Sequence, residues 1–222
     1  QVAKGDFSSL EHSIRSEVEG DVYFDTFTRG RYATDASIYQ INPVGIVVPK
    51  SIQDVKAAMS LASKQGFSLL PRGGGTSQCG QTVNNSLVMD TSKYLNSLID
   101  LNVKELTATV EPGMVLDQLN NFLKPFGLWF PVDISTSAQA TIGGMVGNNS
   151  CGARSIKYGT MRENVIEIKA VLPNGMESWF GPDDRRYKNG LPANLKDSLL
   201  KLGEKYSVAI EHNFPKIMRR VG

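Results

Sequence analysis

Cysteine and histidine are scarce in this sequence, and their scarcity excludes several classes of protein. Among 222 residues there are two cysteines, Cys79 and Cys151, and two histidines, His12 and His212. Two cysteines make neither a disulfide framework nor a cysteine-based metal centre, and we expect no metal site. Both cysteines lie in glycine-rich stretches, so we expect them to pack as small residues and not to be reactive thiols. The small number of cysteines also favours a reducing, cytoplasmic compartment.

The sequence also lacks a dominant charge and a long apolar run. Its 24 basic and 22 acidic side chains leave a formal net charge of +2, so no extended positive field is present to attract nucleic acid. No run approaches the roughly 20 apolar residues of a membrane span, and the N-terminus does not have the order of a signal peptide. We therefore expect no nucleic-acid partner and no membrane span.

What the sequence does contain is a mixed order of helix-like and strand-like segments without an internal repeat. Apolar residues at helical spacing predict helices, the first capped by Asp6 and the second by Ser51. The expected helices are 7–18, 52–65, 115–123 and 192–206. Short apolar runs bounded by turn residues predict strands, with Asn174-Gly175 as a tight turn between the last two. The expected strands are 45–48, 67–70, 86–90, 97–101, 106–111, 165–172 and 176–180.

This order of elements predicts an α+β protein and not a strictly alternating parallel sheet. With 41% hydrophobic residues, the chain is long enough for one sizeable domain or two small lobes. We expect two lobes that divide near residue 100. Residues 1–100, with the N-terminal helix, form the first lobe, and residues 101–222 form the second.

The first candidate ligand site is the glycine-rich stretch 71–80, directly after a predicted strand. The three glycines 73–75 leave successive backbone N–H groups unobstructed by Cβ atoms, and a concave nest of such groups suits phosphate oxygens. Thr76 and Ser77 add hydroxyl donors, while Arg72 supplies either a charge-assisted contact to the ligand or a structural salt bridge. From the glycines alone, a tight loop without a ligand is an equally good interpretation.

Two common phosphate motifs are excluded by their own mechanics. A Walker loop needs Lys and then Ser or Thr after its last glycine, but Gly80 is followed by Gln81-Thr82. A Rossmann fingerprint needs its glycines to open a helix, whereas here the chain passes through Asn84-Asn85 into a predicted strand. A phosphate would therefore meet a loop and not a helix terminus.

A second candidate stretch lies at 140–152. Ala140-Thr141-Ile142-Gly143-Gly144 has small residues that permit close backbone approach, and Asn148, Asn149 and Ser150 offer side-chain hydrogen bonds. Alone, this stretch is more typical of a closely packed helix start than of a ligand site. Together, the two stretches suit an elongated ligand with a diphosphate and a polar ring.

In combination, these stretches resemble the FAD-linked oxidases of the vanillyl-alcohol-oxidase type, and among them the D-2-hydroxy-acid dehydrogenases. The resemblance covers most of residues 25–180, beginning with the segment Arg29 to Tyr39. Five ordered motifs are far more specific than any one of them. They are Pro71 to Gly80, Pro112-Gly113, Pro131 to Ser135, Ala140 to Gly152 with Tyr158-Gly159, and Val165 to Leu172 with Pro173-Asn174-Gly175.

The resemblance implies the two-lobed FAD-binding domain of this (PCMH) type, and it assigns cofactor contacts position by position. Residues 71–77 would wrap the pyrophosphate, 135–144 would line the flavin side, and 148–152 with 165–166 would complete the pocket. Thr76 stands where relatives with covalently attached flavin have a histidine, so we expect noncovalent FAD. The expected contacts are Pro71, Arg72, Gly73, Gly74, Gly75, Thr76, Ser77, Gly80, Gln81, Pro112, Gly113, Pro131, Ser135, Ala140, Thr141, Gly143, Gly144, Asn148, Asn149, Ser150, Gly152, Tyr158, Gly159, Val165 and Ile166.

The resemblance further implies oxidation of a D-2-hydroxy acid to the 2-keto acid by hydride transfer to FAD, followed by delivery of electrons to an acceptor. His12 and His212 lie outside every motif, and Asp35 and Asp133 are typical of loop or capping carboxylates. No residue of the chain is assigned as a catalytic acid or base.

The sequence departs from the family at its C-terminal side. The Ser-Glu-Gly-Thr-Leu-like cofactor string and the substrate or cap domain of relatives are not among these residues. We therefore expect a C-terminally incomplete FAD-binding domain that binds FAD weakly and lacks turnover alone. Two alternatives stay open: a non-catalytic nucleotide- or phosphate-binding module, and an FAD oxidase of another substrate class, such as aryl alcohols or sugars.

Overall fold

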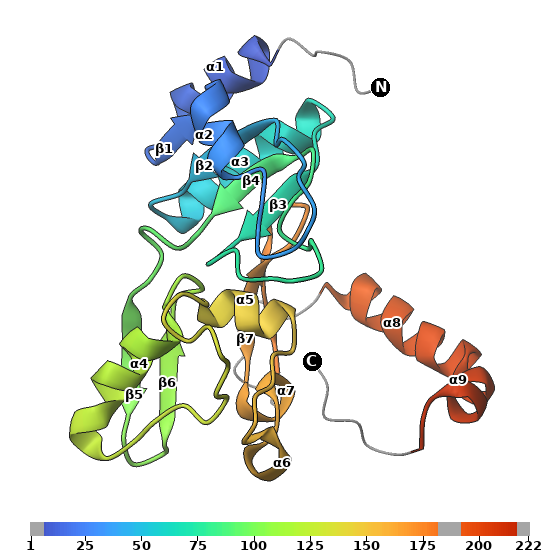
Figure 1. Cartoon of the computed structure of the whole chain (residues 1–222). Coiled ribbons are helices and arrows are strands. Elements are labelled where there is room, and N and C mark those ends of the chain that lie inside the picture. Colours follow the sequence, from blue (N-terminus) through green and yellow to red (C-terminus); the bar gives the residue numbers. More distant parts are fainter. Residues whose placement is uncertain (1–6, 182–191, 217–222) are drawn as a thin grey trace.

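A computed structural model describes residues 7–181 and 192–216 of the chain (Figure 1). Helices and strands are mixed along the described sequence, which confirms the expected α+β class. The strands are β1 (Asp21–Tyr23), β2 (Gly45–Val48), β3 (Leu69–Arg72), β4 (Leu87–Asp90), β5 (Leu98–Asn102), β6 (Thr107–Val110), β7 (Ile168–Val171) and β8 (Glu177–Phe180). The helices are α1 (Ser8–Glu17), α2 (Thr26–Arg31), α3 (Ile52–Lys64), α4 (Leu116–Leu123), the 3₁₀ turn η1 (Lys124–Phe126), α5 (Ile142–Gly147), α6 (Ser155–Tyr158), α7 (Met161–Asn164), α8 (Ala193–Lys205) and α9 (Ser207–Asn213).

The largest sheet is four-stranded, in the order β1-β2-β4-β3. β4 lies between β2 and β3 and pairs parallel with both, whereas β1 pairs antiparallel with β2 at the edge. β3 and β4 are neighbours joined by residues 73–86 without a helix between them. The glycine-rich stretch is therefore the connection between two parallel strands, and it leaves the sheet at the carboxyl end of β3.

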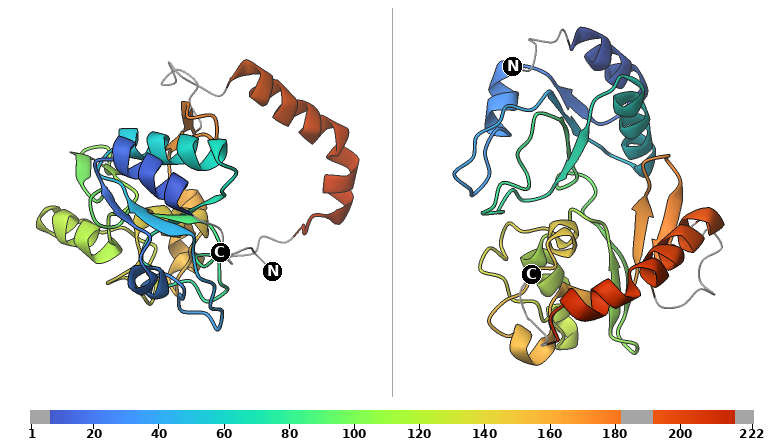
Figure 2. Two further views of the ribbon diagram at one scale, coloured as in Figure 1. Left: turned by 90° about the horizontal axis from the view of Figure 1, so that it is seen from above. Right: turned by 90° about the vertical axis from the view of Figure 1, so that its right-hand side faces the viewer.

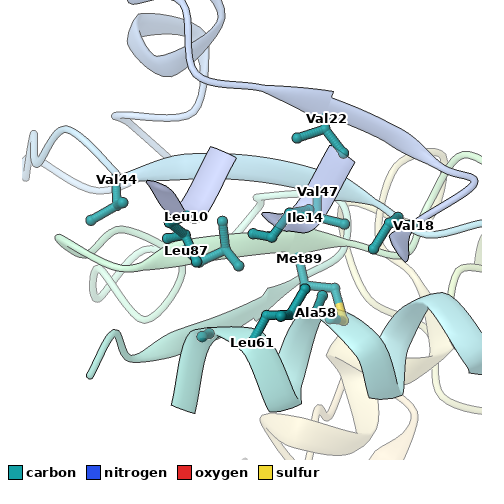
Figure 3. Close-up of a cluster of buried hydrophobic side chains, with 11 residues drawn as sticks. Leu10, Ile14, Val18, Val22, Val44, Val47, Ala58, Leu61, Leu87 and Met89 are labelled. Carbon is teal, nitrogen blue, oxygen red and sulfur yellow. The ribbon is translucent and has the colours of Figure 1, made fainter. Parts of the chain in front are cut away.

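The first hydrophobic core lies between this sheet and the helices α1 and α3 (Figure 3). Along β4 the buried side chains alternate between the two faces, because successive residues of a strand point to opposite sides. Leu87 and Met89 pack with Leu10, Ile14 and the side chains of α3, while Val88 belongs to a smaller cluster on the other face. Side chains of β4 are therefore packed against apolar neighbours on both faces of the sheet.

A second core gathers the elements that follow residue 98. Side chains of α4 and α5 pack with Met114, Val132 and Met161, and the hairpin β5–β6 contributes Leu98 and Val110 at its border. Figure 1 shows this part of the molecule below the four-stranded sheet. The antiparallel hairpin β7–β8 is joined to the first part, since Lys56 of α3 lies 2.5 Å from the Glu177 carboxylate and Lys169 pairs with the same group.

Local chemistry explains where several elements begin and end. The Ser51 hydroxyl accepts a hydrogen bond from the Asp54 amide and caps α3, as expected. Gly175 adopts a φ of +79° in the turn between β7 and β8, which a residue with a Cβ rarely adopts. The predicted cap Asp6 lies outside the described residues.

Some boundaries differ from the sequence expectation. The strand expected at 67–70 runs from Leu69 to Arg72, because its ladder pairs residues 69–72 with Leu87 to Asp90. The strand expected at 165–172 begins only at Ile168, because the preceding residues end the short helix α7. The elements β1, α2, α6, α7 and α9 were not expected from the pattern, and each is seven residues or shorter, whereas α5 confirms the helix start that the stretch from Ala140 indicated.

The helices α8 and α9 stand apart from the rest of the chain in Figures 1 and 2. None of their residues is buried, and large apolar side chains such as Leu199, Leu202 and Val208 are exposed. In the described parts of the chain, no helix is long and apolar enough to cross a membrane.

Candidate cofactor site

The glycine loop, defined as residues 73–82, carries a run of unengaged backbone donors. In the part of the chain that the structure describes, no N–H group of these ten residues donates a hydrogen bond to a protein atom. Gly75 and Gly80 have φ values of +65° and +78°, so the loop twice enters the left-handed region that glycine favours. Donors of this kind are available to a ligand.

The second loop, residues 134–141, lies directly against the glycine loop. A Cβ atom on Gly73 would stand 2.0 Å from the Thr141 hydroxyl oxygen, and one on Gly74 would stand 2.2 Å from the Gln139 carbonyl oxygen. The N–H groups of residues 134–138 likewise donate to no protein atom among the described residues. The two stretches of free N–H donors, about 60 positions apart in sequence, therefore lie next to each other in the fold.

A polar side chain at the end of α5 is hydrogen-bonded to the glycine loop. The Asn148 amide oxygen accepts a hydrogen bond of 3.2 Å from Gln81, and its nitrogen donates one of 3.4 Å to the Ser77 hydroxyl. Asn148 follows α5 directly, so this bridge ties the C-terminal end of α5 to the glycine loop. The structure thus brings together the predicted residues at 73–82, 140–144 and 148.

The glycines at the start of α5 serve close packing. A Cβ on Gly143 would stand 2.7 Å from Pro112, and the Gly143 amide donates to the Pro112 carbonyl oxygen at 2.8 Å. Ile142 and Gly144 donate to the Met114 carbonyl and to the Thr141 hydroxyl. The first N–H groups of this six-residue helix are therefore occupied, and α5 is a packing element beside the loops rather than an anion site.

Residues 149–152 are engaged within the protein. Asn149 has a φ of +46°, and its side-chain oxygen accepts hydrogen bonds from the Thr160 hydroxyl and the Arg162 amide. A Cβ on Gly152 would stand 1.9 Å from the Asp133 carbonyl oxygen. Similarly, Gly113 has no room for a Cβ beside the Thr91 carbonyl oxygen. These predicted contact residues shape the loops through packing.

Other predicted residues belong to a separate cluster around Trp129. The ring of Tyr158 meets the Trp129 ring edge-on at 5.3 Å, and the Arg154 guanidinium lies over Trp129 at 5.2 Å. Pro131 is half-buried in the same loop, and Gly159, with a φ of +85°, ends α6. Val165 packs against the second core, whereas Ile166 is exposed.

Arg72 is hydrogen-bonded to backbone carbonyl oxygens. Its guanidinium donates to the backbone carbonyl oxygens of Tyr32, Thr34 and Thr82, at 3.0, 2.8 and 3.1 Å. It also lies over the Tyr32 ring, 5.2 Å from the centroid. Burial lowers the pKa of this guanidinium, which the neighbouring Asp90 and Asp35 partly offset. The described residues give Arg72 no salt bridge; its half-buried guanidinium instead joins the end of the loop to segment 32–34, and a contact with a ligand stays a prediction.

No sequence pattern indicated the partners of Arg72. The Tyr32 hydroxyl donates to Asp90 at 2.6 Å, and burial, followed by this carboxylate, raises the pKa of the phenol. The Tyr39 ring covers Gly80, where a Cβ would stand 2.6 Å from its Cδ2 atom. Both tyrosines lie some 40 positions from the loop that they contact. The sequence around Arg72 and the glycines therefore contains no local pattern that reveals contacts with tyrosines so far upstream.

The remaining candidate groups have plain structural settings. Asp35 accepts from the Ser37 amide and the Thr82 hydroxyl, and Asp133 accepts from the Arg154 amide, which confirms both as loop carboxylates. His12 and His212 are exposed. Cys151 is half-buried, but Cys79 is exposed, so the expected packing of Cys79 is wrong: the loop turns it outward. Among the described residues, no cluster of acidic, histidine or cysteine side chains is able to hold a metal ion.

These features fit a ligand that carries a diphosphate. Amide donors without partners lie on two adjoining loops, which approach closely because Gly73 and Gly74 leave no room for a side chain, and together these donors form a cradle for anionic oxygens. The hydroxyls of Thr76 and Ser135 lie in the same loops, and Ser135 is exposed. The cradle is built from loop backbone, in agreement with the exclusion of the Walker and Rossmann motifs.

Solved structures identify the fold. The chain superposes on an alkyldihydroxyacetonephosphate synthase with a TM-score of 0.71 at 20% identity, over 85% of this chain and 37% of the other. The fold is the two-lobed FAD-binding domain of vanillyl-alcohol-oxidase (PCMH) type flavoproteins. This is the class of protein that the loops and the sheet define.

The family follows from the sequence comparison. The sequence model described as "FAD binding domain" matches residues 43–181, and the chain belongs to this family. D-2-hydroxyglutarate dehydrogenase of Haemophilus influenzae is 42% identical over 160 residues, 71% of this chain and 16% of the relative. The enzyme of the same name from Escherichia coli is 36% identical over 217 residues, 90% of this chain and 20% of the relative. The chain thus spans about a fifth of the length of these curated relatives, and FAD is the cofactor of the family.

Proposed function

We propose that this chain is the FAD-holding part of a flavin-dependent dehydrogenase that oxidises a D-2-hydroxy acid to the 2-keto acid. The observation that carries the proposal is the pair of adjoining loops, 73–82 and 134–141, whose free N–H groups form a cradle in a chain of the FAD-binding family. The hydroxy-acid class is supported by the identity to D-2-hydroxyglutarate dehydrogenases. Bound FAD supplies the hydride acceptor.

The roles of the residues follow from their surroundings. The glycine loop, with Thr76 and Ser77, holds the diphosphate, and residues 134–141 lie along the flavin. Asn148 ties the end of α5 to the glycine loop, and the glycines at 113, 143 and 152 act through packing. With Thr76 in place of a linking histidine, FAD is held without a covalent bond. The two lobes, 1–100 and 101–222, meet at these loops.

The substrate is tested with the full-length protein that contains this chain. We expect D-2-hydroxyglutarate, D-lactate or another D-2-hydroxy acid to bleach the absorbance of the bound flavin in the absence of oxygen, whereas the L enantiomers do not. Bleaching by an aryl alcohol or a sugar, but by no hydroxy acid, would support the other oxidase class. The 222 residues alone are expected to give no turnover, because the relatives are about five times longer.

The electron acceptor and the compartment are part of the same proposal. A dehydrogenase of this kind passes its electrons to a separate acceptor, and we place the protein in a reducing, cytoplasmic compartment because Cys79 and Cys151 are both free thiols. Aerobic turnover that needs no added acceptor and releases hydrogen peroxide would instead identify an oxidase.

A further inference from the structure

Arg72 stands at the point where β3 becomes the glycine loop, and its side chain folds back under that loop. Its guanidinium nitrogen Nη1 donates to the carbonyl oxygens of Tyr32 and Thr82, and Nη2 donates to that of Thr34. Three of the five guanidinium N–H groups are therefore directed at backbone carbonyl oxygens. The side chain connects the start of the loop, the end of the loop and the distant segment 32–34.

The loop is wrapped around this guanidinium. A Cβ on Gly75 would stand 2.6 Å from Nη2 and 3.2 Å from Cζ, so the left-handed turn at Gly75 lies directly against the group. The Thr82 hydroxyl donates to Asp35 at 2.9 Å, which adds a second tie between the loop end and the same segment. On the other side, the Tyr32 ring supports the guanidinium and is itself fixed by Asp90. The half-buried guanidinium thus contacts the loop both at its left-handed turn and at its end.

The chemistry of the contacts requires arginine. Three carbonyl oxygens on two segments, 32–34 and the loop end, match the planar fork of a guanidinium. The ammonium of a lysine is a compact point charge that does not stack in the same way on an aromatic ring. Because the loop amides have no partners of their own among the described residues, nothing in the loop backbone replaces this support.

We propose that Arg72 is a positioning residue that holds the N–H groups of residues 73–82 in their ligand-binding arrangement while making no contact with the ligand itself. That the ligand is the FAD diphosphate rests on the proposed function. The proposed rigidity of the loop does not rest on it, because Arg72 holds the loop in the ligand-free protein as well. A cradle that is already ordered binds more tightly, because less conformational entropy is lost on binding.

The test compares Arg72→Lys with Arg162→Lys, a change at an exposed arginine of α7. In the ligand-free protein, NMR relaxation gives the order parameters of the loop amides. We expect values for residues 74–81 to fall from about 0.85 to below about 0.6 in Arg72→Lys and to stay unchanged in Arg162→Lys. FAD affinity should fall about three- to tenfold in Arg72→Lys alone, by the same factor at low and at high ionic strength.

Two results would overturn the proposal. If the loop order parameters stay unchanged and the loss of affinity shrinks with added salt, Arg72 contacts the phosphates directly. If the melting temperature falls while order parameters and FAD affinity stay unchanged, Arg72 only stabilises the fold. Should the unaltered protein bind no FAD, the proposed function fails, but the ligand-free order parameters still decide the role of Arg72. Tyr32→Leu, which removes the supporting ring, loosens the same loop and replaces Arg72→Lys if that variant does not fold.

Discussion

At the scale of single residues, the glycines of the site are required for different reasons: some leave no space for a side chain, and others have a positive φ. Gly73 and Gly74 have no space for a side chain because Thr141 and the Gln139 carbonyl oxygen occupy it. Gly75 is required by its positive φ and by Arg72. By contrast, a Cβ on Gly147 would meet nothing within 4 Å. The string of three glycines therefore serves contact between two loops and leaves its backbone N–H groups accessible.

Replacement of Gly74 tests the contact between the loops. Gly74→Ala forces a Cβ against the Gln139 carbonyl oxygen and should separate the loops, at a cost in stability of about 1–3 kcal/mol. FAD affinity should fall at least tenfold, because the two sets of N–H groups no longer face one ligand. Gly147→Ala is the matched control and should raise stability by about 0.5–1 kcal/mol, since it lies at a helical position with open space. Urea unfolding and fluorescence titration measure both, and equal FAD affinities for the two variants would contradict this account of the site.

At the scale of elements, the helices divide into those that build a core and those that do not. α4 buries Leu116, Leu119 and Leu123 against the second core. α8 has a comparable apolar stripe, but all of its described side chains remain at least partly exposed. An amphipathic pattern alone therefore does not tell whether a helix packs, because the pattern is the same in both cases.

One substitution made on both helices shows this difference. Leu119 is 3% exposed and Leu199 is 51% exposed. Leu119→Ala should reduce the free energy of unfolding by about 2–5 kcal/mol through lost burial and the cavity that remains. Leu199→Ala should change it by no more than about 0.5 kcal/mol. Urea denaturation of the two variants measures both values, and a large loss for Leu199→Ala would mean that α8 packs on the protein in solution.

The hairpin β7–β8 is tied to α3 by a carboxylate between two lysines. Hydrogen bonds from Lys169 and Lys56 lower the pKa of Glu177 from 4.5 to about 2. A carboxylate with a lowered pKa in the folded state stabilises the fold above its unfolded pKa, and this stabilisation is lost as the pH falls through the folded pKa. The lysines are partly exposed, so we expect a contribution of no more than about 1 kcal/mol.

Glu177→Gln removes the charge and retains the shape of the side chain. The stability difference between the unaltered protein and this variant should be constant at neutral pH, decline below 4.5 and vanish near 2. Unfolding by urea at a series of pH values gives that difference directly. A difference that is the same at pH 7 and at the acid end would show that the lysine contacts do not stabilise the hairpin.

At the scale of the whole molecule, two cores meet at the two loops that we propose hold FAD. The first core supports β3 and β4 and thus the ends of the glycine loop, while the second core supports α5 and residues 134–141. Contacts such as Gln81 to Asn148 and Lys56 to Glu177 join the two parts. A ligand held by both loops therefore adds a further link between them, and it stabilises the folded chain by about 2.7 kcal/mol at a hundredfold excess over its dissociation constant.

Much of this arrangement follows from local sequence, and the rest depends on contacts between distant residues. The strand Gly45–Val48, the cap Ser51 and the turn at Gly175 were predictable, because each depends on neighbouring residues only. The two ligand loops were predictable as separate stretches. Their contact was not, since it depends on Gly74 meeting Gln139 through the fold, and the role of Arg72 depends on carbonyl oxygens about 40 positions earlier in the chain. The short helices α6 and α7, of four residues each, are too short for a periodic signal.

The most direct test of the central claim is a titration of the 222-residue chain with FAD and, in parallel, with ADP. We expect FAD to bind at a single site with a change in flavin fluorescence, and to bind more tightly than ADP because the second loop contacts the flavin side. Gly74→Ala should weaken FAD binding, and Gly147→Ala should leave it unchanged. Equal affinity for ADP and FAD would instead identify a nucleotide-binding module, and no binding of FAD at any concentration would contradict the site described here.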